Sequence, residues 1–560
     1  MPHIAVALLV AGALYIALWN SFFVGFFNDD VMYIALAQSL AQGTGYTDIE
    51  LVGQPPHGKY PPGFPLMLAP LRALWPHDFM PLKLLGVLFA LGTVWLTARL
   101  YEEEPPSIRW GATALVAMNP FLARFASTVL SDVPFLCLTT GYLVLARRLS
   151  FDSLRGPAGL AVLAALGFYL RAPGMVLFVA TLVYFAVRRI GWKPALTYAA
   201  IFTGLVLPYF WRRGHAGYQG DIVLRYEDMP LADLVVQNLS YYAAAIPLTL
   251  LSDPARHVES LLRQSLSLPL TLLCIATWVC IILGFIVCAR RRIALRAIVT
   301  CGFIGLFLPW PFLDARFFLP IFPLLIGYLL EGVHAVSGRS AERATGGVAA
   351  AICAALLVCN VATIKYPVAA ESRPTNATHS WLRDHTDVGE AITAKGGAFW
   401  LYTGRLMAVL PHWPGAPEGA IRNLLRQDTR WVLLRDAGYP DEAPEWIAAL
   451  EGRKSLFERV YQNPQEGTRI YRVSGDRARF NAAYDCFVRG VQTLSAGDWK
   501  AGKAALDECL RLEPDFPPAE LNRAIACNQL NEKDEARRTL QALLARHPDH
   551  ARARALLETL

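Results

Sequence analysis

Long uncharged apolar blocks constrain this chain more than any other feature of its sequence. The first block, Ile4 to Phe27, contains no charged residue, and about 20 consecutive apolar residues suffice to cross a bilayer core as a helix. No Lys or Arg precedes it, and no small-x-small cleavage site precedes Asp29, so a removable signal peptide is not indicated. The block therefore predicts a membrane-spanning helix.

Similar blocks recur along the first two thirds of the chain. The chain as a whole is 54% hydrophobic and 17% charged. With the first block they predict about eleven transmembrane helices, and hence a mainly α-helical, polytopic membrane protein. The further spans are expected near residues 80–98, 110–128, 132–146, 158–170, 173–187, 195–211, 268–289, 295–312, 317–336 and 346–366.

Positive charges fall on alternate turns between these spans, for example at Arg147-Arg148 and Arg188-Arg189. The positive-inside rule places such turns in the cytoplasm. The segment that carries Asp29 and everything after Lys365 would then face outward, as would a long loop at 212–265. The excess of positive charge lies within residues 1–370, where topology explains it, so it gives no case for a nucleic-acid partner.

Three regions follow from these patterns. Residues 1–370 form the membrane body. Residues 371–475 alternate short apolar strands, such as 430–434 and 468–473, with helical segments, which predicts a small extracytoplasmic α/β domain. Residues 476–560 are helical and repetitive.

The repeats have a period of 34 residues. Leu506, Leu510, Pro514, Asp515 and Ala519 recur as Leu540, Leu544, Pro548, Asp549 and Ala553. This spacing resembles tetratricopeptide repeats. They either cap the α/β domain structurally or bind a protein partner in a small groove.

Two polar motifs stand out in the first outward segment, 28–79. Asn28-Asp29-Asp30 follows the first span, and Lys59-Tyr60-Pro61-Pro62-Gly63 comes about thirty residues later. Ionisable groups at the membrane boundary are costly and mark functional sites by default. Together the motifs favour chemistry on a lipid-carried, phosphate-bearing substrate.

The membrane region resembles bacterial multi-span glycosyltransferases of the GT-C fold. More narrowly, it resembles the protein-mannosyltransferase and aminoarabinose-transferase-like group, which uses polyprenyl-phosphate sugars. The resemblance covers roughly residues 1–475 and rests on the two motifs above with Tyr33, on Ser131-Asp132, and on Asp314-Ala315-Arg316-Phe317. Family members usually carry Asp-Glu where this chain has Asp29-Asp30.

Asp29 matches the catalytic aspartate of that family. A phosphate-linked sugar already has a good leaving group, so one carboxylate can suffice, unlike the acid and base pair of glycoside hydrolases. Its task would be to deprotonate the incoming hydroxyl or amine, and attack opposite the phosphate would invert the anomeric centre. The structural alternative is that Asp29 only caps the helix expected at 30–42.

Lys59 and Arg316 match the positions that hold the lipid phosphate in the resembled family. Lys offers a point charge and Arg a bidentate fork. The alternative for both is contact with lipid headgroups, which any Lys or Arg at the boundary can make. Tyr33 and Tyr60, from the two motifs, complete the expected substrate-binding set together with Arg171, which matches a recurrent family arginine or simply anchors a helix end.

Asp30 and Asp132 join Asp29 as candidate catalytic carboxylates. Asp132 could bind the sugar, a metal ion or the acceptor, or it could cap the helix that starts at Ser131-Asp132. A divalent cation could bind between Asp132 and either Asp29 or Asp30, although carboxylates alone do not require one.

The resemblance implies a glycosyltransferase of the bacterial inner membrane. It would move a monosaccharide from a polyprenyl-phosphate carrier to a cell-envelope lipid, polysaccharide or protein, with its C-terminal region outside the cytoplasm. Two other readings stay open. A transporter of lipid-linked sugar would need charges along a path through the membrane, and a silent anchor that presents the repeats would leave Asp29, Lys59 and Arg316 without a role.

Overall fold

The computed structural model describes residues 2–19, 22–151, 153–213, 229–257, 260–261, 263, 265–291, 295–365, 375–411, 413, 417–435 and 443–560. Its internal contacts divide the chain into two compact units. The first comprises Met1–Ile49 and Gln54–Pro374, and the second comprises Glu50–Gly53 and Thr375–Leu560. The boundary expected at 370 falls in 366–374, outside the described residues.

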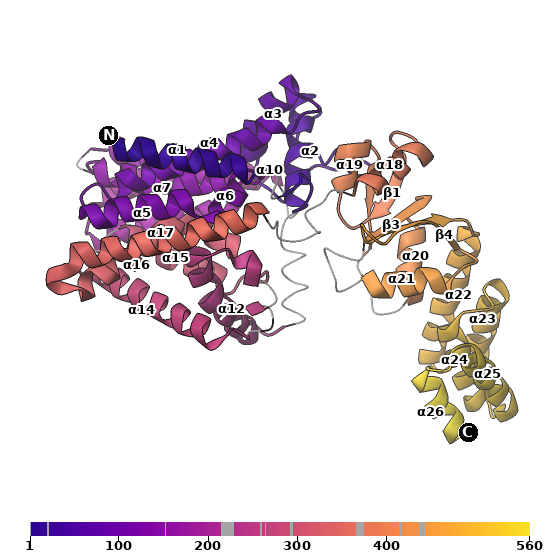
Figure 1. The fold of residues 1–560 in the computed structure, drawn as a ribbon. Helices are drawn as coiled ribbons and strands as arrows, with labels where there is room; N and C mark the ends of the chain where they lie inside the picture. Colours follow the sequence, from indigo (N-terminus) through magenta and orange to yellow (C-terminus); the bar gives the residue numbers. More distant parts are fainter. Residues whose placement is uncertain are drawn as a thin grey trace. The chain divides into compact units, whose positions relative to one another are not determined.

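The first unit is built of α-helices that lie side by side (Figure 1). Short 3-10 helices η1 (Ala172–Gly174), η2 (Pro254–His257), η3 (Ala315–Ile321) and η4 (Gly338–Ser340) link some of them. The α-helices are α1 (Pro2–Ala17), α2 (Asp29–Ala41), α3 (Gly63–Leu74), α4 (Met80–Leu100), α5 (Pro106–Met118), α6 (Pro120–Ala126), α7 (Asp132–Arg148), α8 (Arg155–Leu170), α9 (Met175–Val187), α10 (Trp192–Arg213), α12 (Leu231–Leu251), α14 (Leu268–Arg291), α15 (Leu295–Phe307), α16 (Phe322–Val336) and α17 (Ala341–Lys365).

The expected count of about eleven spans is not confirmed. Six segments of the described chain are long and apolar enough to cross a membrane, and five more apolar helices have 10–17 residues. The first apolar block is one of the short ones, because α1 ends at Ala17 rather than near Phe27. The span expected at 110–128 is split into α5 and α6, since Asn119 is extended and its Oδ1 caps α6 at Leu122 N.

The expectation of one loop over 212–265 is wrong at residues 231–251, and its residues 214–228 lie outside the described part of the chain. Residues Leu231–Leu251 form α12, one of the six long apolar helices. Asp233, Asn238 and Pro247 lower the mean hydropathy of this segment. Asn238 is fully buried, and its amide donates to the carbonyl oxygens of Leu308 and Trp310 at 2.7 Å each. A polar residue inside the helix bundle thus serves packing rather than solvent exposure.

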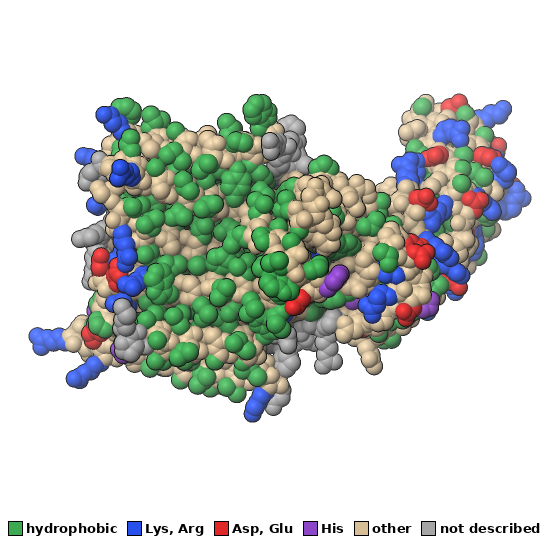
Figure 2. Space-filling model, turned by 90° about the horizontal axis from the view of Figure 1, so that it is seen from above, with side chains coloured by type: hydrophobic (Ala, Val, Ile, Leu, Met, Phe, Trp, Pro, Cys, Tyr) green, Lys and Arg blue, Asp and Glu red, His purple; other side chains and the backbone are tan. Residues whose placement is uncertain are grey.

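The face of the first unit seen in Figure 2 is largely apolar. Figure 2 shows hydrophobic side chains spread over the helices, with Lys and Arg gathered toward one end. Leu9, Leu268 and Trp211 are 74%, 71% and 88% exposed. Apolar surface of this extent suits contact with lipid. The helices suit the same environment, because they satisfy their backbone hydrogen bonds internally.

The second unit begins with a five-stranded mixed sheet of order β2-β1-β3-β5-β4. β1 is parallel to β2 and β3, whereas β5 is antiparallel to β3 and β4. Leu51 forms a bridge with Met407, so residues Glu50–Gly53 cover the edge of β2. The strands are β1 (Ala391–Ala394), β2 (Leu406–Val409), β3 (Trp431–Arg435), β4 (Phe457–Asn463) and β5 (Thr468–Val473), and the helices are α18 (Asn376–His385), α19 (Ala398–Thr403), α20 (Pro417–Leu425) and α21 (Ala443–Gly452).

Antiparallel helix pairs complete the second unit: α22 (Arg477–Ser495), α23 (Trp499–Leu512), α24 (Pro517–Gln529), α25 (Lys533–Arg546) and α26 (Ala551–Thr559). The helices share a core with the sheet region. Trp446 of α21 and Phe480, Leu506 and Phe516 of the helical array belong to one buried cluster. The array therefore packs on the α/β part instead of standing apart from it.

Candidate active site

Asp29 is held by two residues that are distant in sequence. Asn28 turns the chain with a φ of 60°, a left-handed value that Asn tolerates, and α2 begins at Asp29. The Tyr60 hydroxyl donates to Asp29 Oδ1 at 2.7 Å, and Arg316 Nη2 lies 3.0 Å from Oδ2. The position that caps α2 is Asn28, without a side-chain cap bond. The Asp29 side chain, 27% exposed, is thus directed to the cluster.

Arg316 bridges two carboxylates at the start of η3. Its Nε lies 2.7 Å from Asp314 Oδ2, and its backbone N donates to Asp314 Oδ1 at 2.9 Å. Among the described residues, the buried Nη1 of Arg316 has no hydrogen-bond partner. Burial raises the pKa of Asp314, and the charge of Arg316 opposes that rise.

Aromatic rings enclose this ion pair. The guanidinium carbon of Arg316 lies 5.5 Å from the Phe27 ring and 5.7 Å from the Phe317 ring. The Tyr60 ring packs at 4.8 Å from that of Tyr33, and Lys59 Nζ lies 5.8 Å from the Tyr60 ring. These faces attract cations and exclude water, which strengthens the charge interactions between them.

Asp132 and Arg171 form a second ion pair. The Asp132 side chain is 3% exposed and pairs with Arg171 Nη1. The residue before α7 is Ser131, which makes no side-chain cap bond; its hydroxyl instead hydrogen-bonds to that of Tyr33 at 2.9 Å. The Arg171 guanidinium lies 5.9 Å from the Phe317 ring. Phe317 thus lies near both arginines, and Tyr33 links Ser131 to the ring of Tyr60.

Glycines set the spacing of these elements. Gly63 starts α3, and a Cβ built on it would lie 2.5 Å from the Tyr169 carbonyl oxygen near the end of α8. A Cβ on Gly174, in η1, would lie 2.3 Å from Gly167. Both close approaches flank Arg171, so the Pro-Pro-Gly motif brings the loop of Tyr60 next to the end of α8.

Asp30 is directed elsewhere. Its two oxygens accept hydrogen bonds from the backbone of Gly25 at 2.6 Å and Val31 at 3.0 Å, and the residue is 2% exposed. Burial raises the pKa of Asp30 to about 7, and the charge of Asp29 adds to the rise. The Asp30 carboxylate, on the first turn of α2, is therefore directed to the backbone of Gly25 and Val31 and not to Tyr60 and Arg316.

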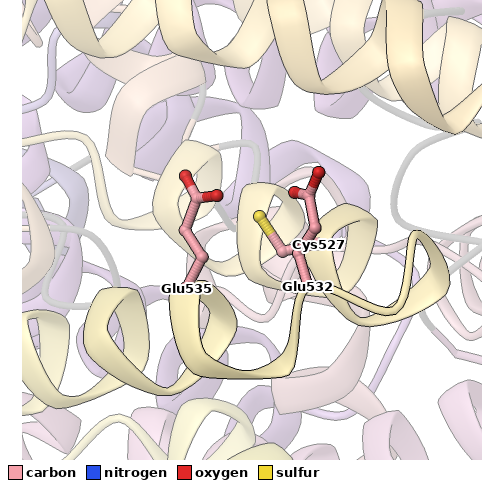
Figure 3. A group of neighbouring side chains, drawn as sticks. All are labelled: Cys527, Glu532 and Glu535. Carbon is pink, nitrogen blue, oxygen red and sulfur yellow. The ribbon is translucent and has the colours of Figure 1, made fainter.

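The carboxylates Asp29, Asp30 and Asp132 do not form a metal-binding group among the described residues. Among the described residues, the group whose ligand atoms lie close enough to bind one metal ion is Cys527, Glu532 and Glu535 in the second unit (Figure 3). Lys503 Nζ lies 2.5 Å from Glu532 Oε2 and 2.8 Å from Glu535 Oε2. Arg523 also pairs with Glu535, so two cations compensate the two carboxylates, and the arrangement is an ion-pair network between repeats.

Sequence reasoning missed Asp314 as a member of the cluster. It stood within the motif that contains Arg316, but its role there depends on η3, whose first turn it caps. Arg316 and Phe317 follow Asp314 within three positions. An Asp directly before a short helix is a typical N-cap, and this was the signal available in the sequence.

Comparison with solved structures identifies the fold. ArnT from Cupriavidus metallidurans in the apo state aligns over 84% of this chain and 96% of its own, with a TM-score of 0.51 and 11% identity. The oligosaccharyltransferase of Archaeoglobus fulgidus, tethered with an acceptor peptide containing the NVT sequon, aligns over 84% and 74%, with a TM-score of 0.53 and 12% identity. Its apo form aligns over 77% and 69%, with a TM-score of 0.50 and 13% identity.

The chain has the GT-C fold. Identity this low establishes the fold and leaves the substrate open. The tetratricopeptide-repeat family matches residues 493–560, which confirms the nature of the C-terminal helices. No curated protein matches by sequence. In this GT-C chain, the Asp29 and Arg316 cluster joins α2, the loop before α3, and η3.

Proposed function

We propose that this chain transfers a monosaccharide from a polyprenyl-phosphate carrier to a hydroxyl or amine of a cell-envelope acceptor. The observation that carries the proposal is the pairing of Asp29 with Arg316, an arginine whose Nη1 lacks a hydrogen-bond partner within the described chain. The partly exposed carboxylate can take up a proton from the acceptor. The guanidinium beside it has an unused donor that can stabilise the departing phosphate.

Asp29 is the general base in this reaction. It takes the proton from the acceptor, whose oxygen or nitrogen attacks the anomeric carbon opposite the phosphate. The bond between that carbon and the phosphate oxygen breaks, its electrons leave with the polyprenyl phosphate, and the configuration inverts. Tyr60, which donates to Oδ1, orients the carboxylate so that Oδ2 can act.

Arg316 links the two halves of the reaction. Before transfer its Nη2 faces Asp29. Once Asp29 is protonated, the attraction between them weakens, and the guanidinium can turn its donors to the charge developing on the phosphate. Lys59 supplies a second positive charge beside Tyr60. The proton transfer and the departure of the phosphate thereby support each other.

The Asp132 and Arg171 pair is assigned to the sugar or acceptor. Both charges are compensated by each other, so hydroxyl groups can hydrogen-bond to them without displacing an ion. We infer that the enzyme works in the bacterial inner membrane with the second unit outside the cytoplasm. The tetratricopeptide repeats could bind a protein partner there.

Purified full-length protein incubated with radiolabelled polyprenyl-phosphate sugars and membrane extract tests the reaction class. We expect release of free polyprenyl phosphate, label on the acceptor, and inversion at the anomeric carbon. A parallel assay in sealed vesicles measures movement of the intact donor across the bilayer. Movement without release would overturn the proposal in favour of a transporter.

A further inference from the structure

A short two-stranded ribbon lies between the two motifs of the site. His57 N donates to the Tyr46 carbonyl at 2.9 Å, and Asp48 N donates to the Pro55 carbonyl at 2.9 Å. Thr47 and Pro56 form an isolated antiparallel bridge. The ribbon brings the side chains of Asp48 and His57 into contact, and His57 lies two residues before Lys59.

His57 is packed under the backbone of Tyr60. Its Nδ1 lies 2.6 Å from Asp48 Oδ1, and its Nε2 accepts a hydrogen bond from Tyr60 N at 2.7 Å. The imidazole stacks on the Tyr60 ring at 5.4 Å with 16° between the planes, and the His57 side chain is 1% exposed. The Tyr46 hydroxyl donates to the Tyr60 carbonyl at 3.0 Å.

Both backbone polar groups of Tyr60 are therefore held by side chains. Pro61 and Pro62 follow and have no N–H to offer, so the Tyr60 amide is the donor by which this part of the loop can be fixed. Since Nε2 accepts, the proton of the neutral ring must sit on Nδ1, where it is donated to Asp48. A carboxylate at Nδ1 fixes that tautomer.

We propose that Asp48 and His57 are positioning residues for transfer. They hold the Tyr60 backbone so that its hydroxyl stays 2.7 Å from Asp29 Oδ1 and orients the base. This inference rests on the proposed function of Asp29. It assigns a role to two side chains that lie outside the pair of Asp29 and Arg316, and it makes the ribbon a support of the site.

Two substitutions of His57 separate its contacts. In His57→Gln the amide oxygen lies where Nε2 stands and can accept the hydrogen bond from Tyr60 N. In His57→Asn the shorter side chain extends only to the position of Nδ1, so Tyr60 N loses its acceptor. We expect His57→Asn to lower kcat by about tenfold or more, because the Tyr60 amide loses its acceptor, and His57→Gln to restore most of it. The KM for the donor should change less than twofold in either variant.

Asp48→Asn tests the tautomer lock. An amide can donate to Nδ1, which would move the ring proton to Nε2 and set it against Tyr60 N–H. A loss of kcat similar to that of His57→Asn is expected. Full activity in both Asp48→Asn and His57→Asn would overturn the inference.

A double-mutant cycle with Tyr60→Phe tests whether His57 acts through the Tyr60 hydroxyl. In the Tyr60→Phe background, His57→Asn should cost little further activity, because the hydroxyl that it positions is already absent. Equal losses of activity in both backgrounds would contradict the inference and assign His57 a purely structural role.

Hydrogen exchange of the Tyr60 amide keeps this inference distinct from the proposed function. In full-length protein, a peptide spanning residues 57–66 should exchange faster in His57→Asn than in wild type, with protection regained in His57→Gln. If wild type transfers no sugar, the proposed function fails whatever the exchange shows. If wild type is active but the exchange of the variants matches wild type, the positioning role fails alone.

Discussion

Tyr60 donates its phenolic hydrogen to Asp29 Oδ1 at 2.7 Å across a separation of 31 residues in the chain. Arg316 approaches the other oxygen of the same carboxylate at 3.0 Å. The carboxylate is therefore fixed from two sides, one neutral and one charged. In the proposed mechanism, a base held in this way needs no rearrangement before it accepts a proton.

Tyr60→Phe removes the neutral contact and keeps the ring. A hydrogen bond to a charged group contributes about 1.5–3 kcal/mol, so kcat should fall by about 10–150-fold, with donor KM little changed. Initial rates of label transfer measure this. Tyr169→Phe is the matched control, because it removes a hydroxyl that donates to the Leu205 carbonyl, outside the cluster. A KM effect without a kcat effect would contradict the assigned role of Tyr60.

Arg316→Lys keeps the charge and removes the fork. An ammonium cannot contact Asp29, Asp314 and a phosphate in the same geometry. Because Arg316 turns to the phosphate only during transfer, kcat should fall by about tenfold or more. Donor titration of the transfer rate measures the change. Arg99→Lys serves as the control, since Arg99 is 39% exposed and pairs with Glu102 away from this cluster. An unchanged kcat in Arg316→Lys would contradict the role of Arg316 at the leaving phosphate.

Gly63→Ala should disturb the approach of α3 to α8. The added methyl group would meet the Tyr169 carbonyl at 2.5 Å, and overpacking of this kind costs about 1–3 kcal/mol. We expect a lower melting temperature and reduced transfer, because the displaced loop carries Tyr60. Gly159→Ala, on the open face of α8 where no atom lies within 4 Å of the new methyl group, should leave both unchanged or raise stability slightly. Equal behaviour of the two variants would refute the packing argument.

Arg453→Ala should loosen the join between the sheet region and the repeats. Arg453 is 8% exposed, lies 3.1 Å from Glu418 Oε1 and donates to the Asp515 carbonyl at 2.6 Å. Removing it leaves Glu418 buried without its partner, at a cost of about 3–5 kcal/mol in the free energy of unfolding. Hydrogen exchange across α22 in the full chain should rise. Arg511→Ala breaks an exposed pair with Glu508 and should leave that exchange unchanged.

The sequence singled out residues of the candidate site, but it did not show their contacts with one another. The motifs around Asp29, Lys59 and Arg316 stand out because charges are rare beside long apolar blocks. The pairing of Asp132 with Arg171 was not predictable, because it depends on how α7 meets the end of α8. Asp132 was expected to bind the sugar, a metal ion or the acceptor, or to cap a helix. Arg171 was expected to bind substrate or to anchor a helix end. In the structure the two side chains pair with each other.

The misplaced elements have a common physical cause. Asp233 and Asn238 made α12 look like a loop, since hydropathy averages over a segment and ignores which side chains the bundle buries. Asp30 was grouped with Asp29 because the two are adjacent, yet neighbouring side chains on a helix leave in directions about 100° apart. Asp48 and His57 stand nine residues apart in the chain, and only the ribbon brings their side chains together.

The most direct test of the account compares donor binding and transfer in wild type and Asp29→Asn. The amide oxygen of this variant can still accept the Tyr60 hydrogen bond, but the amide cannot take up a proton. The account predicts that the variant binds the polyprenyl-phosphate sugar at least as tightly, because Arg316 is released toward the phosphate, while its transfer rate falls by about 10²–10⁴-fold. Transfer by Asp29→Asn at the wild-type rate would contradict the account and move the base elsewhere.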